Sequence, residues 1–173
     1  NGLQNINQLH RANLNILAKQ YQLDNMIDDI KLLVANSYLQ VMFNQEILTT
    51  QKSQLIIAKE QLKRTISLID AGVLPVGDVF ELEANLASQE QSIIQAENNY
   101  ILSKISLAQL LQISDYENFN VVIEDLDIPF STILDNSPKS IFEKALTLRN
   151  DIKLGVVNIE IAEKDIELAK GSL

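Results

Sequence analysis

The sequence has no cysteine, one histidine, three prolines and five glycines among 173 residues. Without cysteine, disulfide scaffolds, thiolate metal sites and cysteine nucleophiles are excluded. The single histidine, His10, excludes a metal site built from several histidines and leaves little material for a catalytic triad. The chain also lacks a glycine-rich phosphate loop and any pairing of a nucleophile with a base, so we expect no enzyme activity, no metal and no cofactor.

Positive charge is also scarce. The sequence has 14 Lys and Arg residues and 23 Asp and Glu residues, which gives a net charge of −9. This balance argues against nucleic-acid binding and against docking on an anionic membrane surface. Apolar runs such as 32–35 are far shorter than the roughly 20 residues that a membrane-spanning helix needs. The first residues carry no signal-peptide pattern, and we interpret the chain as a segment of a larger protein.

Aliphatic residues dominate what is present. Leu and Ile make up 48 of the 173 residues, against nine Phe and Tyr and no Trp. Few turn-forming residues and many aliphatic ones predict an all-α protein with long helices. The hydrophobic content of 46% argues against disorder.

Residues 1–70 are predicted to form one very long helix, because 5–70 contain neither Gly nor Pro. Strict seven-residue spacing indicates a coiled-coil seam against a partner helix. The seam consists of Ile27, Val34, Val41, Leu48, Leu55, Leu62 and Ile69. Its companion positions are Leu9, Ile16, Leu23 and Ile30, followed by Ser37, Asn44, Gln51, Ala58 and Thr65. Because the companion positions change from large to small or polar near residue 37, we expect the two halves to face different neighbours.

A turn is predicted at 71–78, followed by a return helix at 78–112. Gly72 suits the left-handed conformation that ends a helix, Pro75 prevents continuation, and Gly77 or Asp78 can cap the next helix. The return helix carries its own three-four pattern, at Val79, Leu82, Leu86, Gln89, Ile93, Ala96, Tyr100, Ser103, Leu107 and Leu110. We therefore expect a very long antiparallel helical hairpin, similar to a coiled coil, in which the return helix covers 36–70.

The remaining chain is predicted to be shorter and less regular. Residues 113–150 contain a β-prone run at 120–124, an extended stretch at 127–129 and a short helix at 137–149, with Ser137 as its cap and Pro138 in its first turn. A final helix at 151–171, capped by Asn150 and Asp151 and ended by Gly171, is expected to return along 5–35. Its predicted packing face is Ile152, Val156, Ile159, Ala162, Ile166 and Ala169. We expect all of this to form one elongated domain over 1–173.

Three stretches in this order resemble one repeat of the outer-membrane efflux protein family, the TolC-like channels. They read VANSYLQVMFNQE at 34–46, AGVLPVGDVFELEANLA at 71–87, and ALTLRNDI with AEKDIELAK at 145–152 and 162–170. Three positions depart from the family pattern. Leu68 stands where the family often has Arg, Gly77 where it has Thr or Ser, and Asn150 where it has Pro.

The resemblance implies a periplasmic helical conduit segment, part of an α-barrel, with 113–150 as the equatorial region. The family forms homotrimers with outer-membrane β-strands, which this segment lacks. Its channels export small molecules or drugs passively in a tripartite pump. The implied partners are a periplasmic adaptor and, through it, an inner-membrane pump, and the implied location is the periplasmic part of a Gram-negative outer-membrane protein.

The tip turn is the candidate functional site that the resemblance implies. In the family this turn meets the adaptor, and its matching residues here are Gly72, Val73, Leu74, Pro75, Val76 and Asp78. Exposed aliphatic residues at the end of a hairpin favour a partner contact. The alternative is an ordinary turn whose aliphatic side chains close the end of the coiled coil, with Asp78 as a helix cap.

Other polar residues have two interpretations each. Asp24, Asp28 and Asp29 either line a lumen or form a solvated face, and their spacing does not favour a metal site. Asn44, Gln51 and Gln89 either set the register of the coiled coil or face water in a lumen. Two other functions stay open for the whole chain: the helical hairpin of a periplasmic membrane-fusion adaptor, and a structural coiled-coil scaffold.

Overall fold

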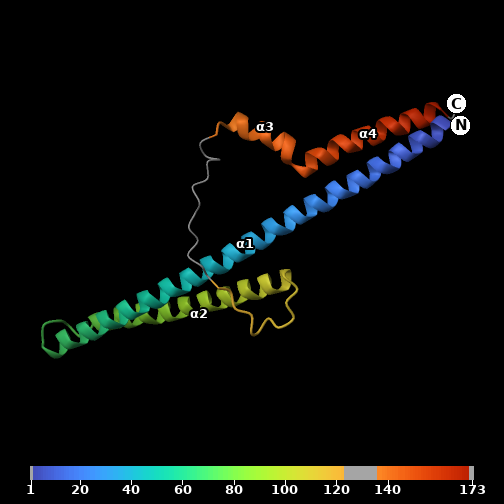
Figure 1. Ribbon diagram of the computed structural model, residues 1–173. Helices are drawn as coiled ribbons and strands as arrows, with labels where there is room; N and C mark the ends of the chain where they lie inside the picture. The colour runs from blue at the N-terminus through green and yellow to red at the C-terminus, as the bar shows by residue number, and fades with distance from the viewer. Residues whose placement is uncertain (1, 123–135, 172–173) are drawn as a thin grey trace. The chain divides into compact units, whose positions relative to one another are not determined.

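The protein is all-α. The computed structural model describes residues 2–122 and 136–171, and within these ranges it contains four helices and no strand (Figure 1). The helices are α1 (Gly2–Asp70), α2 (Asp78–Leu110), α3 (Pro138–Leu148) and α4 (Asn150–Lys170). At 69 residues, α1 is about 100 Å long. The all-α class predicted from composition is therefore confirmed.

The contacts divide the described chain into two units. Unit 1 contains 2–32 and 136–171, and unit 2 contains 33–122. The helix α1 runs through both, so each of its halves has its own neighbour. In unit 2 this neighbour is α2, and in unit 1 it is α4 (Figure 1).

In unit 2, α2 runs antiparallel to the second half of α1. Two ion pairs define the direction, Lys52 with Glu97 at 2.8 Å and Lys59 with Glu90 at 3.4 Å. All ten positions of the three-four pattern on α2 are buried or half-buried, and so are the seam positions of α1 from Val34 to Ile69. Heptad spacing therefore identifies the packed face of both helices in this unit.

In unit 1, α4 packs antiparallel to the first half of α1, but not through the predicted faces. The core consists of Leu14, Ala18 and Val157, with Tyr21, Leu154 and Ile161 packed against it. The predicted residues Leu9, Ile16, Leu23 and Ile30 of α1 and Val156, Ile159 and Ile166 of α4 are exposed. Both helices carry apolar residues on more than one face, so periodicity alone selected the wrong one.

Polar contacts at both ends of this packing fix the register of α4. Arg11 forms an ion pair with Asp165, and the Asn150 side-chain amide donates to Asp28 at 3.1 Å. Since Leu14 and Ala18 lie between these two contacts in α1, the polar pairs bracket the small apolar core.

The start of α3 follows the prediction and the start of α4 does not. The Ser137 hydroxyl accepts the Ser140 amide at 3.2 Å, with Pro138 in the first turn. The cap of α4 is Arg149, not Asn150 and Asp151, which lie in its first turn. The Asp151 carboxylate accepts the Arg149 guanidinium and the Ile152 amide, and these hydrogen bonds hold the pKa of Asp151 below its ordinary value. The side chain of Asp151 thus stabilises the first turn from inside it.

The end of α2 contains a strained residue. The helix ends at Leu110, and Gln112 has a positive φ of 56° with Ile113 N–H donating to Ala108 C=O at 2.9 Å. This is the position that glycine usually occupies at a helix end. Of the predicted β-prone run, 120–122 form no strand, while 123–124 and the stretch 127–129 lie outside the described residues. The Tyr38 hydroxyl donates to Val122 C=O at 3.0 Å and anchors this segment on α1.

Candidate functional site

The tip turn begins where backbone hydrogen bonds close the end of α1. Gly72 N–H donates to Ile69 C=O at 2.8 Å, and Val73 N–H donates to Leu68 C=O at 2.9 Å. Gly72 has the positive φ of 74° that this pattern requires, as the sequence predicted. Nothing lies within 4 Å of a Cβ built on Gly72, so its conformation, and not a lack of space, explains the glycine.

Aliphatic side chains of the turn point into solvent. Val73 and Val76 are each 66% exposed, Pro75 is exposed, and only Leu74 is half-buried. A turn that merely closed the coiled coil would bury these side chains against the helices. The exposure of two valines leaves an apolar surface at the end of unit 2.

Sequence reasoning missed one member of this surface. Phe80, in the first turn of α2, is 68% exposed. It follows Val79, which faces α1, and so lies one position outside the packed seam. The sequence did contain an indication of this exposure, because Phe80 is an aromatic residue directly beside a seam position. We define the apolar tip as Val73, Val76 and Phe80.

Exposed carboxylates lie next to the apolar tip in the sequence. Asp70, Asp78 and Glu81 are exposed, and none forms an ion pair within the described chain. Asp78 and Glu81 lie in the first turn of α2, where negative charge is favourable. Asp70 is the last residue of α1, where the helix dipole disfavours negative charge and the last turn holds no basic residue. Its negative charge is therefore unfavourable at this end of the helix.

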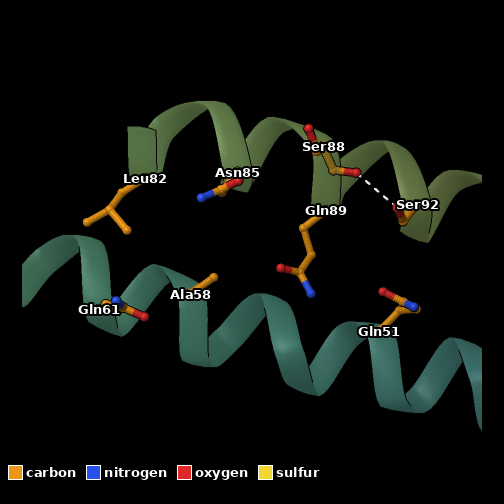
Figure 2. A pocket seen from close by; sticks show the side chains of 8 residues that line it. All are labelled: Gln51, Ala58, Gln61, Leu82, Asn85, Ser88, Gln89 and Ser92. Carbon is orange, nitrogen blue, oxygen red and sulfur yellow. Dashed lines mark hydrogen bonds between the residues drawn. The ribbon is translucent and has the colours of Figure 1, made fainter. Parts of the chain in front are cut away.

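A polar recess lies between α1 and α2, further from the turn. It has a volume of about 460 Å³ and is shown in Figure 2. Its lining is Gln51, Ala58, Gln61, Leu82, Asn85, Ser88, Gln89 and Ser92. Gln89 crosses the helix pair and donates to the Gln54 side-chain oxygen at 3.1 Å. No charged residue lines the recess.

The other predicted polar residues have separate roles. Asn44 donates across the helix pair to Asn99 C=O at 3.2 Å. Asp28 accepts from Asn150 and Lys31, and Asp24 accepts from Gln20. The described residues contain no group of three or more acids or histidines that could hold a metal ion.

Among the described residues, no helix combines the length and the apolar character needed to cross a membrane. Comparisons with known protein families, curated proteins and solved structures found no match to this chain. The resemblance to the TolC-like channels therefore depends on the three stretches of sequence alone.

Proposed function

We propose that the chain is the periplasmic helical segment of an outer-membrane efflux channel, and that its tip turn docks a periplasmic adaptor. In this proposal α1 and α2 are neighbouring helices in the wall of an α-helical barrel. The segment takes no part in covalent chemistry and encloses a passive path for small molecules or drugs. A homotrimer of the full protein and an inner-membrane pump complete the assembly.

The observation that carries the proposal is a second heptad seam on α2. Its positions follow the same three-four spacing as the seam that contacts α1: Phe80, Ala84, Ala87, Gln91, Ile94, Asn98, Ile101 and Ile105. Seven of these eight side chains are exposed, with Ile94 at 60% and Ile101 at 50%, and Ile105 is half-buried. We call this face the open seam.

The angle between the two seams supports a ring of helices. At 3.5 residues per turn their centres lie roughly 150° apart around α2. A helix with seams on nearly opposite sides is suited to stand between two neighbours. If each helix contacts its two neighbours through these seams, the angle between the seams equals the interior angle of the ring. An interior angle of roughly 150° closes a ring of about a dozen helices. A solitary two-helix scaffold needs only one seam, so this observation favours the barrel.

The composition of the tip supports docking. Val73, Val76 and Phe80 of the apolar tip are exposed, and so are the carboxylates of Asp70, Asp78 and Glu81 beside them in the sequence. A complementary surface has an apolar centre and cationic residues at its edge, because apolar burial supplies affinity and charge supplies orientation. The proposed adaptor should present such a surface.

The docking test uses the protein in its native cells. A photo-crosslinking amino acid replaces Val76 in the parent protein, and the matched control carries it at Leu102, which is 60% exposed and about 36 Å along α2 from Asp78. We expect a cross-linked product with an adaptor from position 76 and none from position 102. Equal products from both positions, or none from position 76, would contradict docking at the tip.

A further inference from the structure

The open seam of α2 is partly complementary in size to a second copy of itself that lies antiparallel to it. In an antiparallel pair of two α2 helices, the symmetric register places Phe80 opposite Ile105 and Ala84 opposite Ile101 of the other copy. Ala87 then faces Asn98, and Gln91 faces Ile94. Two of these four layers, Ala84 with Ile101 and Ala87 with Asn98, combine a small residue with a larger one, which lets the two surfaces interdigitate there. The face is about 40 Å long.

Charges beside the open seam fit the same register. Glu83, Glu90, Glu97 and Lys104 repeat every seven residues along its edge. The two central carboxylates, Glu90 and Glu97, are already paired with Lys59 and Lys52 of α1. They therefore repel a second copy less than bare carboxylates would.

The outer two charges of this row have opposite signs, and neither has a charged partner among the described residues. Glu83 forms no ion pair within the described residues. The Lys104 ammonium donates to the neutral Asn120 side chain at 3.0 Å and lies 5.6 Å from the centre of the Tyr100 ring. In the antiparallel register, Glu83 of each copy lies within one helical turn of Lys104 of the other. Two equivalent attractive pairs result, one at each end of the contact.

We propose that the open seam of α2 binds the open seam of a second copy of this chain, antiparallel and two-fold symmetric, with Glu83 paired to Lys104 across the contact. This pairing goes beyond the proposed function. In a channel the same face takes a neighbouring helix of opposite direction, whereas in the free chain it is available to its own copy. The contact is stabilised by apolar burial and oriented by the two charge pairs.

Charge reversal tests both the contact and its direction. Sedimentation equilibrium gives the dimer dissociation constant of the wild-type chain, of Glu83→Lys and of Lys104→Glu, at concentrations from roughly 1 to 500 µM. Each single variant places like charges together at both ends of its dimer, so we expect each to weaken dimerisation by about tenfold. An equimolar mixture of the two variants restores both attractive pairs, and we expect its heterodimer to regain wild-type affinity within about twofold.

Two controls separate this contact from other effects. Glu60→Lys makes the same charge change on an exposed position of α1 and should leave the dissociation constant unchanged. Circular dichroism confirms that each variant keeps its helix content. Ile94→Glu places a charge in the centre of the open seam and should abolish the dimer.

Three results would overturn the pairing: a wild-type chain that stays monomeric over the whole range, single variants as strong as wild type, or a mixture no stronger than the single variants. A dimer that persists in Ile94→Glu would likewise place the contact on another face. None of these results changes the cross-linking expected at Val76, so failure of the pairing and failure of the proposed docking are distinguishable.

Discussion

Two stretches of the α1–α2 contact share one heptad pattern and differ in packing. Away from the turn, the seam residues Val41, Ile93, Ala96 and Leu107 are buried. Between Gln51 and Ser92 no described residue is buried, and the polar recess opens beside the seam. Heptad spacing thus determines which face a helix turns to its neighbour, while the size and polarity of the side chains determine how much surface is removed from water.

Because of this difference, the part of unit 2 that stabilises the helix pair is separate from the part that is exposed to solvent. The buried stretch holds the helices together, and the polar stretch separates it from the apolar tip. Local opening is expected to be easiest where few apolar contacts are buried. Four predictions follow this contrast.

The largest effect is expected from removing a core side chain. Leu107 is 3% exposed, so Leu107→Ala should lower the free energy of unfolding by about 2–3 kcal/mol. Leu82 lines the recess and is half-buried, so Leu82→Ala should cost about 1 kcal/mol or less. Urea denaturation followed by circular dichroism measures both. Equal costs would show that the two stretches are packed alike.

A gain of stability is expected from filling the recess. Gln51 and Gln89 occupy seam positions and line the recess, so the double variant Gln51→Leu, Gln89→Leu should raise the free energy of unfolding by about 1–2 kcal/mol. The lost hydrogen bond from Gln89 to Gln54 is exposed and offsets little of this gain. Amide hydrogen exchange in 51–61 and 82–92 should slow in parallel. A loss of stability would mean that the polar layer is itself a structural contact.

A smaller gain is expected at the end of α2. Gln112 has a left-handed backbone that glycine adopts without strain, so Gln112→Gly should stabilise unit 2 by about 0.5–1 kcal/mol. Gln112→Ala keeps the Cβ and is the matched control, with no comparable gain. Thermal unfolding of the two variants provides the comparison, and a destabilised glycine variant would be inconsistent with this account of the helix end.

The smallest effect is expected at the ion pairs. Lys52 and Glu97 are each about half exposed, so Lys52→Met should change the free energy of unfolding by about 0.5 kcal/mol or less. This difference should shrink further at 1 M salt, because exposed pairs are screened. A cost above that of Leu82→Ala would assign charge a larger role in the contact than apolar burial.

In unit 2 the predicted seam positions are buried or half-buried, because a short turn joins the two helices. Gly72 and Pro75 fix the turn, and the connected helix must then pack on the nearest seam. Unit 1 was predicted less well. Its helix α4 is far from α1 in sequence and has apolar residues on several sides, so pattern alone did not distinguish Val157 from Val156. The cap at Arg149 was also missed, because its side chain stabilises the turn through Asp151 and does not cap it directly.

The candidate site was predicted in part for a similar reason. Glycine, proline and aspartate in 71–78 indicate a turn, because each of them affects the backbone at its own position and can therefore be recognised in the sequence. The exposure of Phe80 depends on which neighbouring position faces α1, a property of the folded helix pair. The second seam on α2 was present in the sequence, but its significance depends on knowing that α1 occupies only the first.

The most direct test of the channel proposal is the location and assembly of the native parent protein. Antibodies against this chain are used to probe membrane fractions of the cells that produce it, with samples run before and after boiling. The proposal predicts a band in the outer membrane that runs as a trimer until it is boiled. An inner-membrane or free periplasmic band would contradict the channel and favour an adaptor, and a cytoplasmic band would leave only a coiled-coil scaffold.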